Sequence, residues 1–282
     1  MDLCNLSVIK SVMAEAGISF KKEFGQNFLT NSLIPEQIAE SCTEITDSLI
    51  IEIGPGIGCL TAELASRFKR VLAIEIDKGL IPVLDKTLSE FDNVIVINAD
   101  VMKIDIAALA DRYSGGMPIS VCANLPYYIT TPIIMYLLES GVKLKSITVM
   151  VQNEVAARLC AAPGSSDYGA ITAILGYYGK AKKLFKVSAG CFIPAPKVDS
   201  AVVKIDLYDA PVYSPKNERL FRNIIKAAFE MRRKTLVNAL SAKLSIPKDK
   251  ITEAIRELGH SETVRGERLS TEEFVKLSDI LS

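Results

Sequence analysis

The chain has 282 residues, of which 49% are hydrophobic and 23% charged, and its formal net charge is zero. These values exclude a disordered protein, and the length accommodates one sizeable domain with a smaller one beside it. Six scattered cysteines without a Cys-x-x-Cys pair, and a single histidine, argue against a zinc or iron site and predict reduced thiols. The first predicted element is a helix over residues 6–16. Because Lys10 and Glu15 interrupt it, it resembles neither a signal peptide nor a membrane span, and we expect a cytoplasmic protein.

Short β-branched runs then alternate with longer helical stretches. The predicted strands cover 49–53, 71–76, 94–97, 119–123, 147–151, 184–188 and 201–207. The predicted helices between them cover 60–68, 80–88, 104–113, 132–139 and 170–178. This alternation predicts a doubly wound α/β domain with a parallel sheet. After Tyr208 only helical patterns remain, so we predict an α/β domain over 1–209 and a helical domain over 210–282.

A glycine-rich turn, IEIGPGIG over residues 51–58, follows the first predicted strand. Gly54 and Gly56 would let the backbone approach a ligand closely, and the next helix offers free N–H groups. Glu75 and Asp100 end the next two strands, where carboxylates can accept hydrogen bonds from the ribose and the amino group of an adenosine. No lysine or arginine lies in the turn, which favours a nucleoside cofactor without phosphates. A tight turn without a ligand and a nicotinamide dinucleotide site are the alternatives, although the latter has G-x-G-x-x-G spacing.

The fourth predicted strand ends in Asn124-Leu125-Pro126-Tyr127. An adenine amine is a poor nucleophile because its lone pair is delocalised into the ring. The side-chain oxygen of Asn124 and the carbonyl of Leu125 can accept its two N–H bonds and direct the lone pair at a methyl donor. Pro126 would stiffen the turn, and Tyr127 offers a ring on which a purine can stack. Catalysis would then need positioning and electrostatics, without a metal; an ordinary Asn-Pro turn is the alternative interpretation.

The charges are unevenly distributed along the chain. Residues 1–139 carry 10 Lys and Arg against 18 Asp and Glu, whereas residues 140–248 carry 18 against 7. Residues 249–282 carry 5 against 8. The basic block can face a polyanion. It can equally be a solvated surface, and charge alone does not distinguish the two.

With these motifs the chain resembles the ribosomal RNA adenine N6-dimethyltransferases, most closely the bacterial small-subunit (16S) enzymes whose loss gives kasugamycin resistance. The resemblance spans nearly the whole chain and includes FGQNFL over 24–29, FIPAPKVDS over 192–200 and FEMRRKTLVN over 229–238. It implies a Rossmann-like S-adenosylmethionine-dependent methyltransferase fold with a central, mostly parallel seven-stranded sheet. It also implies dimethylation of two adjacent adenosines in the 3′-terminal hairpin loop of 16S ribosomal RNA. The immature 30S particle would be the partner, with a role in small-subunit biogenesis.

The resemblance also implies roles for individual residues. The FGQNFL segment would fold over the methionine part of the cofactor. The cofactor-binding residues would be Gln26, Asn27, Leu29, Gly54, Gly56, Glu75, Ile76, Asp100, Val101 and Asn124. Phe192 would stack on the target adenine opposite Tyr127 and complete the catalytic set with Asn124, Leu125 and Pro126. The RNA-binding residues would be Arg158, Lys197, Arg222, Arg232, Arg233 and Lys234.

Three other functions stay open on the sequence alone. The large-subunit (23S) dimethyltransferases that give macrolide resistance share the sheet motifs, and DNA adenine methylases use a similar Asn-Pro-aromatic turn. A non-catalytic ribosome assembly factor could have the same fold. The long helical region and the RRKTL run over 232–236 favour the small-subunit enzyme. We expect a monomer that uses neither a metal nor a membrane.

Overall fold

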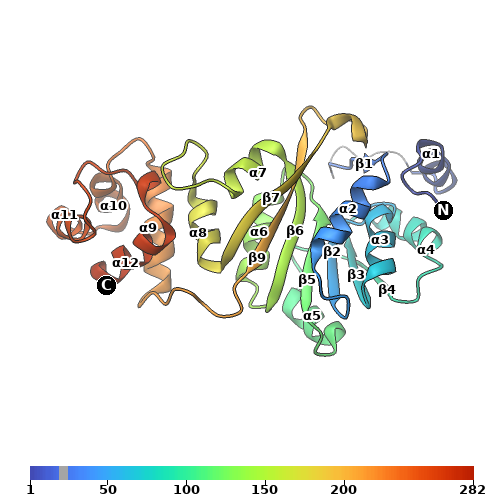
Figure 1. Ribbon diagram of the computed structural model, residues 1–282, viewed down its shortest axis with the longest axis horizontal. Coiled ribbons are helices and arrows are strands. Elements are labelled where there is room, and N and C mark those ends of the chain that lie inside the picture. The colour runs from blue at the N-terminus through green and yellow to red at the C-terminus, as the bar shows by residue number, and fades with distance from the viewer. Residues whose placement is uncertain (19–24) are drawn as a thin grey trace. The chain divides into compact units, whose positions relative to one another are not determined.

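The computed structural model describes residues 1–18 and 25–282 (Figure 1). Phe24, the first residue of the FGQNFL segment, therefore lies outside the described residues. The chain forms two compact units, one of residues 1–156 and 182–207 and the other of residues 157–181 and 208–282. The first unit carries the sheet, and the second is built mainly from helices.

The sheet has seven strands in the order β4-β3-β2-β5-β6-β9-β7. The strands are β2 (Leu49–Ile53), β3 (Arg70–Glu75), β4 (Val94–Asn98), β5 (Ile119–Asn124), β6 (Leu144–Gln152), β7 (Gly179–Val187) and β9 (Ser200–Leu207). The five strands from β4 to β6 pair in parallel, and β9 pairs antiparallel with β6. This confirms the predicted mostly parallel, seven-stranded Rossmann-like sheet. Because β2 pairs with both β3 and β5, the strand order reverses there, and the ends of β2 and β5 flank the position where such sheets bind ligands.

Helices cover the sheet and protect its apolar strands from water. All five residues of β2 are buried, as expected for a central parallel strand covered on both faces. The helices of this part are α2 (Leu33–Cys42), α3 (Cys59–Arg67), α4 (Ile81–Thr87), α5 (Ile106–Ser114) and α6 (Thr130–Glu139). Ile38 of α2 and Leu64 of α3 pack with Ile50 of β2 in one buried cluster. The sheet is thereby held as a rigid base for the loops at its edge.

The N-terminal helix α1 (Leu6–Glu15) packs beside the glycine-rich turn. Its buried residues Ile9 and Val12 form a cluster with Ile57 of the turn, Phe28 and Leu80. Apolar spacing along α1 thus explains why this helix stays on the first unit. The segment before α1 consequently lies close to the start of α3.

Several elements differ from the sequence prediction. The short strands β1 (Phe28–Leu29) and β8 (Phe192–Ile193) pair antiparallel, and neither was predicted, because two-residue strands leave no periodic signal. The helices α2 and α7 (Asn153–Leu159) were also missed. The strand β7 begins five residues before the predicted position 184, at Gly179. Lysines alternate with half-buried residues in its first half, and an apolar-run criterion does not detect such an edge strand.

The second unit consists of α8 (Ala170–Tyr178), α9 (Glu218–Glu230), α10 (Leu236–Leu244), α11 (Lys248–Glu257) and α12 (Thr271–Leu281), with α7 crossing the division. Ala173 of α8 is buried in the same cluster as Phe221 and Phe274. Gly176 of α8 lies so close to α12 that an added Cβ would be 2.3 Å from the Thr271 hydroxyl. Residues 157–181 therefore group with the helices, whereas the sequence prediction began the helical domain at 210. Periodicity shows that α8 has an apolar face but not which helices cover it.

Candidate active site

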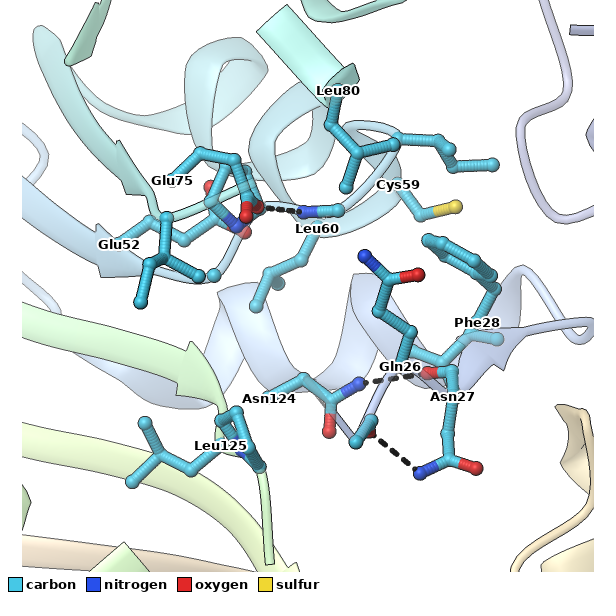
Figure 2. A pocket seen from close by; sticks show the side chains of 18 of the residues that line it. Gln26, Asn27, Phe28, Glu52, Cys59, Leu60, Glu75, Leu80, Asn124 and Leu125 are labelled. Atoms are coloured by element: carbon cyan, nitrogen blue, oxygen red, sulfur yellow. Dashed lines mark hydrogen bonds between the residues drawn. The ribbon is translucent and has the colours of Figure 1, made fainter. Parts of the chain in front are cut away.

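A pocket opens in the first unit at the ends of β2, β3 and β5 (Figure 2). It encloses about 780 Å³ of space, including the part open to solvent. It is lined by residues 25–29, Glu52, 54–57, Cys59, Leu60, 75–76, Leu80 and 124–127. The structure thus brings the FGQNFL segment, the glycine-rich turn and the Asn124–Tyr127 turn to one cavity.

The glycine-rich turn depends on backbone conformations that favour glycine. Gly56 has a φ of +62°, and a Cβ there would lie 3.0 Å from the ring of Phe28. Gly58, with a φ of +97°, precedes the first residue of α3. A side chain at Gly56 would be strained and would also crowd the residue that covers the pocket. At Gly54, with a φ of +72°, an added Cβ would meet no atom within 4 Å, so the backbone is open to close approach at that position.

Glu75 ends β3 and is held by the glycine-rich turn. One of its carboxylate oxygens accepts the N–H of Gly56 at 3.2 Å, and the other accepts the N–H of Asp77 at 2.8 Å. Its side chain is only 4% exposed, and burial raises its pKa, while the two backbone hydrogen bonds oppose that shift. Asp77 in turn accepts a hydrogen bond from the Gln26 amide at 3.0 Å. Each carboxylate oxygen has a further lone pair, so Glu75 can still accept hydroxyl groups from the pocket.

Glu52 is a pocket residue that the sequence analysis did not single out. It lies in the buried strand β2, is 1% exposed, and its Oε2 has no hydrogen-bond partner among the described residues. Burial raises its pKa to about 8, with the neighbouring Thr61 hydroxyl opposing the shift and the nearby Glu75 adding to it. A buried carboxylate without a cation is unfavourable, and a cationic ligand would favour its ionised form. The signal that could have revealed it is an acid inside the otherwise apolar run LIIEI.

Asn124 connects the catalytic turn to the FGQNFL segment. Its amide nitrogen donates to the backbone carbonyl of Asn27 at 3.3 Å (Figure 2). Since the nitrogen is committed, the side-chain oxygen is the atom available to accept a hydrogen bond from a ligand. The N–H of Leu125 bonds to Met150 on β6 at 3.2 Å, and the Thr130 hydroxyl bonds to the carbonyl of Pro126 at 3.1 Å. Three hydrogen bonds thus fix the turn: one to Asn27, one to β6 and one to the start of α6.

Tyr127 and Phe192 have different positions. Tyr127 lines the pocket, and its hydroxyl lies 2.6 Å from the hydroxyl of the buried Ser200 at the start of β9. Burial raises the pKa of Tyr127. Phe192 does not line the pocket; it is 4% exposed and packs with Leu29 in the core of the first unit. The β1–β8 pairing, in which Leu29 lies opposite Phe192, orients the ring this way. Its stacking on an adenine stays a prediction.

Asp100 and Val101 follow β4 and are not among the residues that line the pocket. An oxygen of Asp100 accepts the N–H of Met102 at 3.0 Å, and its other oxygen lies 3.2 Å from Lys103. Val101 is buried, whereas Ile76 does line the pocket. Contact of Asp100 and Val101 with an adenine ring stays a prediction.

The basic residues expected to contact RNA occur in both units. Lys197 is exposed and lies beside Asn153 and Asp199 in a shallow groove of the first unit. In the second unit Arg158, Arg233 and Lys234 are exposed. Arg222 stacks on the ring of Tyr178 and pairs with Glu218 at 2.6 Å, and Arg232 pairs with Glu267 at 2.8 Å. The last two arginines thus have partners within their own unit.

Among residues 1–18 and 25–282, no helix is long and apolar enough to cross a membrane. In the same part of the chain no cluster of His, Cys, Asp or Glu could hold a metal ion. The lining of the described pocket includes no lysine or arginine, and its buried charged groups are carboxyls. This lining suits a positively charged ligand better than a phosphate.

The chain is similar to known proteins along its whole length. Residues 17–282 match the model of the family described as ribosomal RNA adenine dimethylase. The chain is 50% identical to the ribosomal RNA small subunit methyltransferase A of Lachnoclostridium phytofermentans over 93% of this chain and 91% of that protein. It is 46% identical to the protein of the same name from Streptococcus pneumoniae over 100% and 98% of the two chains.

Solved structures give a related result. A dimethyladenosine transferase from Plasmodium falciparum has a TM-score of 0.75 and 26% identity and covers 89% of this chain and 95% of its own. The 23S rRNA methyltransferase ErmE has a TM-score of 0.69, also at 26% identity, over 90% and 99% of the two chains. The fold is therefore shared with a dimethyladenosine transferase and with a 23S rRNA methyltransferase.

Proposed function

Because this chain belongs to the ribosomal RNA adenine dimethylase family, we propose that it transfers methyl groups from S-adenosylmethionine to N6 of adenosines in small-subunit ribosomal RNA. Two relatives named for the small subunit, at 50% and 46% identity, support this target over the large-subunit RNA. The finer proposal is two methyl groups on each of two adjacent adenosines in the 3′-terminal hairpin loop of 16S RNA. The substrate would be the 30S particle in the cytoplasm, and the protein would act on it as a monomer.

The observation that carries the proposal is the meeting of two buried acids and the Asn124–Tyr127 turn at one pocket. Bound S-adenosylmethionine supplies an electrophilic methyl group on a positively charged sulfur. The unpartnered oxygen of Glu52 and the carboxylate of Glu75 provide the negative charge that such a cation needs. Glu75 is also the acceptor available for ribose hydroxyls, and Gly54, where an added Cβ would meet no atom within 4 Å, leaves room for close approach. Asn27 and Leu29 cover the cavity beside Asn124.

The turn that follows β5 accounts for activation of the adenine amine. The side-chain oxygen of Asn124 accepts one N–H of the amine, and the carbonyl of Leu125 accepts the other. The two acceptors hold the nitrogen lone pair out of the ring plane and towards the methyl group. Tyr127 supports the purine with its ring while its hydroxyl is held by Ser200. These groups act by position and electrostatics, and the amine proton leaves to solvent after transfer.

The basic surface accounts for RNA binding. Residues 140–248 carry a large excess of Lys and Arg, and their exposed members in both units can neutralise phosphates. We assign the helical region mainly to RNA binding. The target adenine would be unstacked from a loop, which requires less free energy where base pairing is absent.

The test measures methylation of three candidate substrates, using isotopically labelled cofactor. The full chain is incubated with 30S subunits lacking the modification, with 23S RNA and with duplex DNA, and nucleosides are analysed by mass spectrometry. We expect dimethyladenosine only from the 30S subunits. Asn124→Ala should lower the rate by roughly 100-fold or more, as for loss of one transition-state hydrogen bond. The matched control is Asn31→Ala, outside the pocket. Product only from 23S RNA or DNA, or full activity of Asn124→Ala, would refute the assignment.

A further inference from the structure

A second groove of the first unit lies where β6 ends and β9 begins. It is lined by Gln152, Asn153, Glu154, Lys197, Val198 and Asp199. The N–H of Asn153 donates to the carbonyl of Asp199 at 3.0 Å, which joins the two walls of this β6–β9 groove. None of its six residues lines the pocket at the Asn124–Tyr127 turn. The groove is therefore a separate surface, to which the proposed methyl transfer assigns no role.

Two contacts place the β6–β9 groove next to Tyr127. The hydroxyl of Tyr127 lies 2.6 Å from the hydroxyl of Ser200, the first residue of β9. Ser200 is in turn paired directly with Gln152 across the β6–β9 ladder. Paired residues of neighbouring strands point to the same face of a sheet, with Cβ atoms about 4.5–5.5 Å apart. The side chain of Gln152 therefore begins on the face where Ser200 meets Tyr127, the residue proposed to support the target purine.

The side chains of the groove suit a nucleotide. The Gln152 carboxamide is half-buried and makes no hydrogen bond within the described part of the chain, so its oxygen and its NH2 are both available. A carboxamide can bind adenine through two hydrogen bonds, accepting one from the amino group and donating one to a ring nitrogen. Lys197 is exposed and pairs with no acid among the described residues, so it can neutralise a phosphate. Val198, which is 46% exposed, can pack against the base.

The charges around the groove also favour an anion. Asp199 is paired with Lys186 at 2.7 Å. The side-chain oxygen of Asn153 accepts a hydrogen bond from Lys183 at 2.6 Å, which orients this lysine without neutralising it. Together with the lysine of the groove wall, three lysines thus stand against two carboxylates, those of Asp199 and Glu154. This balance suits a nucleotide better than a cation.

We propose that the β6–β9 groove binds the nucleotide next to the target adenosine and that Gln152 selects adenine there. The Gln152 carboxamide forms the two hydrogen bonds with the base, and Lys197 contacts its phosphate. Because the groove lies on one side of the Asn124–Tyr127 turn, it receives the neighbour on one side of the target only. Both residues determine specificity and take no part in methyl transfer. This inference rests on the proposed function, in which the substrate contains two adjacent adenosines.

The experiment uses the full-length protein and 30S subunits reconstituted with 16S RNA in which either of the two adenosines is replaced by cytidine. Mass spectrometry of RNA fragments gives kcat/KM for the remaining adenosine, relative to the same adenosine in unsubstituted subunits. With the wild-type protein, we expect one of the two replacements to lower kcat/KM by roughly 5- to 150-fold, which corresponds to the ~1–3 kcal/mol of one bidentate contact. Gln152→Ala should remove this preference for adenosine. Gln37→Ala is the matched control and should keep it, because Gln37 is exposed on α2 and lines neither the pocket nor the groove.

Two further variants separate recognition of the base from neutralisation of the phosphate. Gln152→Glu keeps an acceptor but loses the donor, and a carboxylate can accept the amino group of cytosine, so the preference should shift towards cytidine. Lys197→Ala should lower kcat/KM for both neighbours alike and reduce the log–log salt slope of binding by about 0.7–0.9. Melting temperatures show whether the variants fold. If Gln152→Ala does not, the isosteric Gln152→Glu carries the same comparison.

Three outcomes have distinct meanings. The same preference for adenosine in wild type, Gln152→Ala and Gln152→Glu would overturn the assignment of Gln152. An unchanged salt slope in Lys197→Ala would overturn the phosphate contact. Wild-type protein that leaves unsubstituted 30S subunits unmethylated would instead count against the proposed function, so the two failures are distinguishable.

Discussion

Replacing Glu52 by glutamine should change how the stability of the ligand-free protein depends on pH. Burial in β2 raises the pKa of Glu52 from 4.5 to about 8. A carboxyl with a higher pKa in the folded chain binds its proton more tightly when folded. Its contribution to stability is therefore complete below the unfolded pKa and is lost as the pH rises to the folded value. Glutamine keeps a similar shape but never ionises, so the variant should not show this loss.

The size of the effect follows from the shift. One pKa unit corresponds to about 1.4 kcal/mol, so across the roughly three units between pH 5 and pH 8 the wild-type chain should lose on the order of 4 kcal/mol that Glu52→Gln retains. Near pH 5 the two proteins should be almost equally stable, because protonated Glu52 and glutamine are both neutral. Above pH 8 the difference should level off. Glu75, the charged neighbour of Glu52, is present in both chains.

Urea unfolding at several pH values between 5 and 9 measures this difference. Glu15→Gln is the control: the hydrogen bond from Lys86 lowers the pKa of Glu15, so this carboxyl is ionised in both states throughout the window. The change in the free energy of unfolding caused by Glu15→Gln should therefore not vary with pH. A difference between Glu52→Gln and wild type that does not vary with pH would show that the buried carboxyl is not protonated in the ligand-free protein.

The hydrogen bonds and charges of the site make three further outcomes measurable. Glu75→Gln should weaken cofactor binding by roughly 10- to 100-fold in calorimetry, since hydrogen bonds to charged groups contribute ~1.5–3 kcal/mol; unchanged affinity would contradict its role as ribose acceptor. Ser200→Ala removes the 2.6 Å partner of the Tyr127 hydroxyl and should lower kcat several-fold while the KM for cofactor stays constant, and equal changes in both would argue for general disruption. RNA affinity should fall with salt, each phosphate contact adding about 0.7–0.9 to the log–log slope, and a slope near zero would contradict a phosphate-binding surface.

Local patterns in the sequence determined the sheet and the place of its ligand site. Apolar runs of four to six residues predicted β2, β3, β4 and β5 to within one residue of their ends, and β6 except for its first three residues, because a parallel strand buried on both faces is apolar throughout. Parallel strands all end at the same edge of a sheet, so the positions of Gly54, Glu75 and Asn124 at strand ends were enough to predict that they meet. Each of these inferences needs only neighbours in the chain and one rule of topology.

Only the tertiary structure decided matters that depend on contacts between distant segments. Glu52 is an acid without a partner because no described basic side chain reaches it, which no single strand can reveal. Phe192 lies in the core because β8 pairs with β1, and Asp100 accepts the N–H of Met102 within its own turn. The Cys59 thiol meets the backbone carbonyl of Leu3 because α1 packs on the glycine-rich turn. Burial and charge pairing are properties of surroundings assembled from the whole chain, so they follow from the fold and not from any one motif.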